Sequence, residues 1–234
     1  MRRIALGLTV TVWILGASLW VRADSLTILP GAPSTITGPA VCKPGFSPPQ
    51  CTAVPYDTSG NFAFSGNGSA SPAVALNNIA DTFPYLSPIH LPQYANDGFY
   101  GNGSSWISNS TNSWVMVDLG QVALVNALLF GRDRTGGFDD RGPGQFTIAV
   151  SLDGVNFITI FNSADFGFSG LIFGAQTLQA DFTPVQAQYI KITVQNSGAA
   201  IDEIELRGTV VPEPGTLLLL GTGLAGLWLK RRTN

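Results

Sequence analysis

The stretch Gln145-Phe-Thr-Ile-Ala-Val-Ser151 indicates the fold class of this 234-residue chain most clearly. Apolar Phe146, Ile148 and Val150 alternate with the side chains between them. A period of two residues is typical of a β-strand that buries one face against a core. Asp153-Gly154 follows the stretch and reads as a tight hairpin turn, because glycine accepts the positive φ that such turns require. The stretch therefore predicts an antiparallel strand.

Further short segments on both sides of this stretch have the same character. They are Trp114-Val-Met-Val-Asp-Leu119 and residues 122–130, 157–161, 176–182, 188–194 and 201–207. Turn signals such as Leu119-Gly120 and Asn196-Ser-Gly198 separate them. No convincing helical stripe of ten or more residues interrupts the series. Seven or eight short strands within roughly 135 residues predict an all-β protein with a β-sandwich, and that length is enough for one sizeable core.

The first 23 residues have the pattern of a secretory signal peptide. Arg2 and Arg3 form a basic start, residues 4–20 are apolar and uncharged, and Val21-Arg22-Ala23 suits a cleavage site. A permanent N-terminal membrane anchor is the alternative. Cleavage after Ala23 would begin the mature chain at Asp24.

The C-terminus has three parts in a fixed order. Pro212-Glu213-Pro214 is followed by an apolar run over residues 215–229 and then by Lys230-Arg-Arg232. The run of 15 residues is short for a membrane helix, which usually needs about 17–25, although snorkelling and bilayer thinning extend its reach. The basic residues would stay in the cytoplasm. The alternative is a buried C-terminal helix of a soluble domain.

This tail resembles the PEP-CTERM sorting signal of bacterial exported proteins, and the signal occupies residues 209–234. The resemblance implies a transmembrane helix over residues 215–229 and processing at Pro212-Glu213-Pro214 by an exosortase, a membrane transpeptidase. It also implies export through the inner membrane, transient anchoring there, and transfer to the cell surface or secretion. The short apolar run is consistent with temporary anchoring in the inner membrane.

The segment between the two ends is acidic. Residues 24–211 contain six Lys and Arg but fourteen Asp and Glu, which gives a charge of −8 against −3 for the whole chain. Nucleic acid is excluded as an expected partner, because phosphate binding needs clustered basic residues. The abundance of Gly, Ser, Asn and Thr suits a loop-rich β protein outside the cell.

Residues 24–72 are rich in Pro, Gly, Ser and Thr, and we interpret them as a loosely structured N-terminal extension with one or two strands. They contain the chain's two cysteines, Cys42 and Cys51, nine positions apart. An even pair in an oxidising compartment predicts a local disulfide. A metal site would need more Cys or His nearby, and the sequence has none there.

Residues 73–208 contain a series of short motifs in a characteristic order. They are Asn96-Asp97-Gly98, Ser105-Trp106, Trp114-Val-Met-Val-Asp-Leu-Gly120, Phe146-Thr-Ile-Ala-Val-Ser-Leu-Asp-Gly154 with Phe157, Tyr189-Ile-Lys-Ile-Thr-Val194 and Ile201-Asp-Glu-Ile-Glu-Leu-Arg-Gly208. Through the order of these motifs, residues 73–208 resemble the discoidin-type domain, also called the coagulation factor 5/8 type C domain, of the galactose-binding-like superfamily. The resemblance implies an eight-stranded jelly-roll sandwich that binds carbohydrate or lipid head groups without catalysis.

The same resemblance implies a structural calcium ion, for which Asp97, Asn102, Ser104 and Glu203 are the candidate ligands. Calcium takes six to eight oxygens from carboxylates and backbone carbonyls, and the glycine-rich loop 97–104 can turn carbonyls inward. The loop is longer than is common in the family and offers Asn and Ser where the family has a second Asp and a Thr. Solvated loop acids are the alternative.

A basic cluster marks the candidate ligand site. The loop 132–141 provides Arg132, Arg134, Phe138 and Arg141, which can clamp sugar hydroxyls and stack on a pyranose ring. A self-neutralising surface loop is the alternative, because Arg–Asp pairs at the surface contribute at most about 1 kcal/mol each. His90, the only histidine, is a further candidate contact, although a lone histidine is more often structural.

Enzyme signatures are missing from the sequence. A Ser-His-Asp triad would have to use His90, and neither a nucleophile elbow nor a phosphate loop occurs. We therefore expect an exported, non-catalytic protein that binds extracellular polysaccharide at the cell surface or in the matrix. The alternative is a structural matrix or biofilm component with no small-ligand site, and a glycoside hydrolase is a distant third.

Overall fold

The computed structural model describes residues 24–30, 37–42, 53–64, 74–77, 90–101, 105–131, 141–170 and 176–211. These residues form eleven β-strands and two short 3₁₀ helices. The strands are β1 (Ser25–Pro30), β2 (Val54–Pro55), β3 (Val74–Asn77), β4 (Phe99–Tyr100), β5 (Trp106–Ile107), β6 (Ser113–Gly131), β7 (Phe146–Ser151), β8 (Ile158–Asn162), β9 (Gln176–Val194), β10 (Ala200–Ile201) and β11 (Glu203–Val210), and the helices are η1 (Pro92–Asn96) and η2 (Ser163–Phe166).

The two longest strands, β6 and β9, hold the sandwich together, because each contributes to both of its layers. Their pairing is interrupted between Asp118 and Ala123, where the chain bends at Gly120 with a φ of 68°. The first half of β6 pairs with β3 and the second half with β11. The second half of β9 pairs with β7, and its first half with β1.

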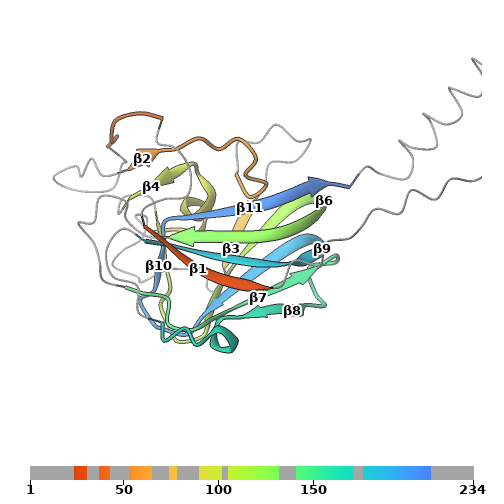
Figure 1. The fold of residues 1–234 in the computed structure, drawn as a ribbon. Helices are drawn as coiled ribbons and strands as arrows, with labels where there is room; N and C mark the ends of the chain where they lie inside the picture. The colour runs from red at the N-terminus through yellow and green to blue at the C-terminus, as the bar shows by residue number, and fades with distance from the viewer. Residues whose placement is uncertain are drawn as a thin grey trace, which may run out of the picture.

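One layer thus has the order β1–β9–β6–β11, and the other has the order β3–β6–β9–β7–β8. All of these pairs are antiparallel, and Figure 1 shows β6 and β9 each running out and back. This confirms the predicted all-β sandwich.

The core lies between the two layers and contains the side chains that alternate inward along the strands. Phe146, Ile148 and Val150 of β7 are buried, as their spacing predicts. Phe146 is central to an aromatic cluster, packing edge-on against Phe130 at a ring-centroid distance of 4.9 Å and stacking on Phe161 at 5.9 Å. Burial of this kind is the main stabilising term of such a fold.

The sequence divides β6 and β9 into two strands each, whereas the structure has two continuous bent strands. The two predicted halves of each strand lie in different layers of the sandwich. The sequence therefore predicts the layers correctly, but it does not predict that the strand continues through the bend.

The N-terminal extension, where it is described, belongs to the same hydrogen-bonded sheet, because β1 pairs with β9 along all six of its residues.

The sandwich has two distinct ends. At the end that we call the loop end, β6 and β7 begin and β9 terminates, so that Ser113, Phe146 and Val194 lie side by side. At the opposite end, which we call the tail end, β6 and β9 bend between the layers. The described chain also starts and finishes at the tail end, since Asp24 Oδ1 accepts a hydrogen bond from Thr183 N (2.9 Å) and Val211 N donates one to Val122 O (3.2 Å).

Three predicted features lie outside the described residues: the signal peptide, the apolar run 215–229 and the sorting motif Pro212-Glu213-Pro214. Among the residues that the structure does describe, no helix is long and apolar enough to cross a membrane. Cys42 is disulfide-bonded, whereas Cys51 lies outside the described residues.

Candidate functional site

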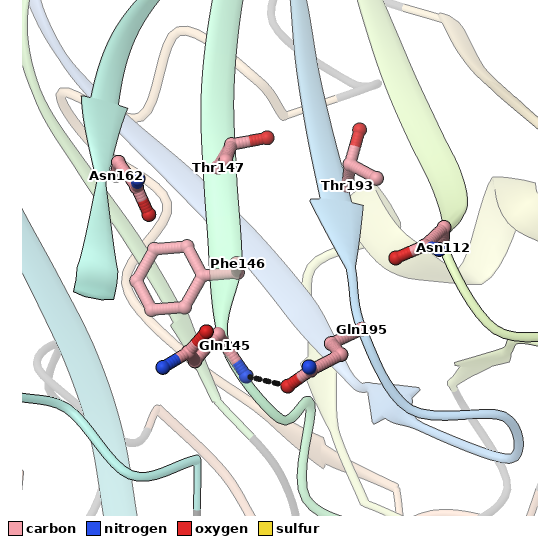
Figure 2. Close-up of a pocket in the computed structure, with 7 residues that line it drawn as sticks. All are labelled: Asn112, Gln145, Phe146, Thr147, Asn162, Thr193 and Gln195. Atoms are coloured by element: carbon pink, nitrogen blue, oxygen red, sulfur yellow. Dashed lines mark hydrogen bonds between the residues drawn. The ribbon is translucent and has the colours of Figure 1, made fainter.

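A polar pocket lies on the outer face of the β3–β6–β9–β7–β8 layer at the loop end. Its volume is about 160 Å³, and Figure 2 shows side chains from three strands and their ends around it. The lining residues are Asn112, Gln145, Phe146, Thr147, Asn162, Thr193 and Gln195. Apart from the buried Phe146 they are all amides or hydroxyls, so the pocket presents uncharged hydrogen-bond donors and acceptors.

The strand register explains why these side chains gather. Thr193 of β9 pairs with Thr147 of β7, and Thr147 pairs with Asn162 of β8. On the other side, Thr193 pairs with Trp114 of β6. Residues paired across strands point to the same face, so the four side chains form one row along the outer surface of the layer.

An aromatic and cationic cluster adjoins this row. Lys191 Nζ lies 4.0 Å from the ring centroid of Phe157 and 5.9 Å from that of Trp114, within the range of cation–π attraction. Trp114 is half-buried, so part of the indole surface remains open beside the polar row. An aromatic face next to amides and hydroxyls can stack on an apolar sugar face while it hydrogen-bonds the hydroxyls.

Backbone hydrogen bonds hold the rim of the pocket in place. Gln195 N donates to Gln145 O (2.9 Å), and Gln145 N donates to the side-chain Oε1 of Gln195 (3.2 Å), the bond drawn in Figure 2. Asn112 has a φ of 57°, a left-handed conformation that asparagine tolerates, and its N–H donates to Gln195 O (3.3 Å). The loops that carry the three amide side chains are therefore tied to one another.

A second group of functional interest is a buried cluster of acids, also at the loop end. Glu203 at the start of β11 is fully buried; its Oε1 accepts a hydrogen bond from Tyr56 Oη (3.0 Å) and its Oε2 accepts one from Gly98 N (3.2 Å). Asp202 Oδ2 accepts from Gly101 N at 2.9 Å. The backbone of the 97–101 loop is thus held by the acids that precede and begin β11.

Burial raises the pKa of the Glu203 carboxyl well above its usual range, and the negative charge of nearby Asp97 raises this pKa further. Burial also raises the pKa of the Tyr56 and Tyr100 hydroxyls, an effect that Glu203 and Glu205 reinforce. Tyr100 Oη donates to Glu205 Oε1 at 2.8 Å, and Arg207 forms an ion pair with the same carboxylate. The cluster therefore gathers several acidic groups in a region with little solvent, where burial favours the protonated form of Glu203.

The predicted calcium ligands are partly brought together. Asp97 and Glu203 lie close enough for the charge of one to shift the pKa of the other, while Asn102 and Ser104 lie outside the described residues. No group of three or more His, Cys, Asp or Glu side chains suited to a metal ion occurs within the described part of the chain. A calcium ion at Asp97 and Glu203 would consequently need backbone carbonyls as further ligands. The paired acids fit a cation, because its charge would offset the repulsion between them.

The predicted ligand residues have different placements. Arg132, Arg134 and Phe138 lie outside the described residues. Arg141 is exposed at the loop end, where its carbonyl accepts a hydrogen bond from Ala200 N (3.0 Å). His90 is only 4% exposed, and its Nδ1 lies 2.8 Å from Ser105 Oγ, so the structure places it in a buried contact away from solvent.

Sequence reasoning missed the pocket residues. Thr147 and Thr193 are the outward polar positions of two alternating strands, so the period of two could have indicated that they face solvent. The pairing that places them beside Asn162 and Trp114 depends on register between strands far apart in the chain, which no local pattern reveals.

Two family models match the chain. Residues 82–205 match the F5/8 type C domain, and residues 210–232 match the PEP-CTERM protein-sorting motif. No curated protein matches the sequence.

Several solved structures are similar in fold. One is the Clostridium perfringens module CpGH89CBM32-5, in complex with GalNAc-β-1,3-galactose, at 17% identity and a TM-score of 0.48, with 58% of this chain and 95% of that chain covered. Another is chitosan-binding module 1 of a Paenibacillus sp. IK-5 chitosanase/glucanase, at 19% identity and a TM-score of 0.45, with 63% and 98% covered. A serum fucolectin from Morone saxatilis has 15% identity and a TM-score of 0.49, with 65% and 48% covered.

Proposed function

This chain belongs to the F5/8 type C domain family and carries a PEP-CTERM sorting motif, and from this premise we propose that it is an exported, non-catalytic protein that binds carbohydrate. The observation that supports carbohydrate most directly is the row of Trp114, Thr193, Thr147 and Asn162 beside the amides of the pocket. Uncharged hydroxyl and amide groups next to an indole face match the mixed polar and apolar surface of a sugar.

The proposed ligand is extracellular polysaccharide. The protein would bind it at the cell surface or in the surrounding matrix, after an exosortase-type enzyme has processed the C-terminal sorting motif. The pocket is open at the surface and bordered by the segment 141–145, in which the basic loop 132–141 ends. A glycan chain can therefore occupy the pocket and contact Arg141 at the same end of the sandwich.

Binding to a glycan array by the exported protein tests this proposal. We expect saturable binding that is weakened by Thr193→Val or Gln195→Ala, since each removes side-chain hydrogen-bonding groups from the pocket. A neutral hydrogen bond contributes about 0.5–1.5 kcal/mol, so each variant should weaken affinity by roughly 2- to 12-fold. Gln186→Ala, a matched amide deletion at an exposed position of the tail end, should leave affinity unchanged.

A second pair of variants separates the pocket from the basic loop. Loss of binding with Arg132→Ala and Arg141→Ala, but not with Thr193→Val, would assign the site to the loop 132–141 instead. If the wild-type protein binds no glycan on the array, the alternative function as a structural matrix component would be favoured. Release of free sugar from the same glycans would contradict the non-catalytic proposal and support a glycoside hydrolase.

We also propose a structural calcium ion beside Asp97 and Glu203, supported by the burial of Glu203 and by the charge repulsion between it and the half-buried Asp97. Calcium should raise the melting temperature and a chelator should lower it. Glu203→Gln should abolish the difference between the two conditions, because it removes a charged ligand. Identical melting with calcium and with chelator, together with no calcium in the purified protein, would rule the ion out.

A further inference from the structure

The tail end of the sandwich carries most of the exposed large hydrophobic side chains. Among the described residues eight such side chains are exposed, and five of them lie in or beside the turns of this end. They are Leu124, Leu152, Val155, Ile158 and Val210. Val155 and Ile158 are 78% and 71% exposed. Several exposed aliphatic side chains gathered at one end form an apolar surface that is unusual for a region in contact with water alone.

The strand pairings place these residues at one end. Ser151, the last residue of β7, pairs with Tyr189, and Tyr189 also pairs with Asp118, just before the bend of β6. The β7–β8 turn that contains Leu152 and Val155 therefore lies beside that bend. Leu124 and Val210 are close to the bond between Val211 N and Val122 O, where the described chain finishes.

The chain leaves the sandwich at this same end, directly into the sorting motif. The motif match begins at residue 210, and the apolar run begins at Gly215, four residues after Val211. Four residues span at most roughly 14 Å even when fully extended. While the apolar run is held in a bilayer, the tail end of the sandwich has to lie next to the bilayer surface. Figure 1 shows the β7–β8 turn and the end of β11 on the same side of the molecule.

We propose that the tail end is a membrane-contacting surface, which rests Leu152, Val155 and Ile158 on the lipid interface for as long as the C-terminal segment is anchored. Aliphatic side chains at an interface gain from burial among the head groups and acyl chains. Asp24, Asp118 and Asp153 lie at the same end, so the surface fits a zwitterionic interface better than an anionic one.

This contact would orient the protein. β11 runs from Glu203 at the loop end to Val210 at the tail end, and eight strand residues advance about 26 Å. The polar pocket and the acid cluster would then point away from the bilayer. The anchored protein could bind a glycan outside the membrane before it is released.

Site-specific photocross-linking in the full-length chain tests the proposal. Benzoylphenylalanine replaces Val155 at the tail end or, as the matched control, Ile28, which is 48% exposed on β1 near the loop end. Both proteins are reconstituted into phosphatidylcholine vesicles, recovered by flotation and irradiated. We expect lipid adducts at position 155 at a several-fold higher yield than at position 28, and equal melting of both proteins in detergent.

Equal yields at the two positions, or adducts at position 155 with a second copy of the chain instead of lipid, would overturn the proposal. Failure of the full-length protein to float with the vesicles would overturn it too, because the proposal requires the protein to be anchored in the bilayer.

A second measurement tests the same contact without introducing a bulky side chain. Amide exchange over residues 152–158 should slow in vesicles relative to the same protein released at Val211, and unchanged exchange would contradict the contact. None of these results depends on whether the pocket binds a glycan.

Discussion

At the scale of single residues, Glu203 shows best how the fold changes the chemistry of a side chain. In the sequence it is one of three acids in the strand pattern Ile201-Asp-Glu-Ile-Glu-Leu206, and the alternation alone does not distinguish it from Asp202 and Glu205. In the structure it is fully buried, held by Tyr56 and Gly98, and close to Asp97. The sequence suggested the acid through family resemblance, but its partner Tyr56 comes from a segment with no recognisable pattern.

The raised pKa of Glu203 predicts a pH dependence of stability. Above the ordinary glutamate value of 4.5 the unfolded chain loses this proton while the folded chain retains it. The free energy of unfolding should therefore fall as the pH rises from 4.5 towards the folded pKa. In the presence of chelator, Glu203→Gln should remove this decline, measured as denaturant midpoints between pH 4.5 and 8. Asp165→Asn, at an exposed position in η2, is the matched control and should leave the decline in place.

Gly208 carries a second prediction at this scale. A Cβ at this position would lie 2.2 Å from the backbone oxygen of Leu124, at the irregularity in the pairing of β11 with β6. Backbone cannot move aside as a side chain can, so Gly208→Ala should lower the free energy of unfolding by roughly 1–3 kcal/mol. Gly38→Ala, whose Cβ would meet only Pro55 Cγ at 3.3 Å, should cost much less. Similar urea midpoints for the two variants would contradict this reading.

At the scale of elements, the strands that sequence predicts well are those with one buried face. The alternation in residues 145–151 and 188–194 is complete, and both stretches form strands where expected. The sequence predicts one or two strands within residues 24–72 but does not place β1, because its residues lie in a Pro- and Ser-rich context and its stability comes from pairing with β9, about 150 residues away. The residue pattern within β1 does not indicate that its partner strand lies so far away in the sequence.

The edge strand β1 predicts a difference between two neighbouring apolar residues. Leu26 packs against the core, whereas Ile28 is half exposed. Leu26→Ala should therefore lower the free energy of unfolding by about 1–2 kcal/mol, less than a fully buried leucine, while Ile28→Ala should change it by less than about 0.5 kcal/mol. Equal effects in thermal or urea unfolding would show that β1 does not pack as described.

At the scale of the whole molecule, the separation of the two ends is the main functional feature. The pocket and the acid cluster lie at the loop end, and the chain enters the sorting motif at the tail end. If the tail end rests on the membrane, the pocket remains accessible.

The glycan affinity of the full-length protein in vesicles should then equal that of the protein released at Val211 within about threefold, a difference of less than 1 kcal/mol. Loss of affinity in vesicles, measured by titration with the glycan identified on the array, would show that anchoring covers the site.

Alternation, composition and a contiguous tail are local properties of the chain, so the fold class, the acidic charge and the sorting motif could all be predicted from the sequence. It also indicated Asp97 and Glu203 as neighbours, through a family motif. Strand pairing, which the sequence does not reveal, places Trp114, Thr193, Thr147 and Asn162 in one row. It also places Leu152, Val155 and Val210 at the end where the described chain finishes. Because β6 and β9 fold back between two layers, the neighbours of a side chain are set by strand register and not by distance along the sequence.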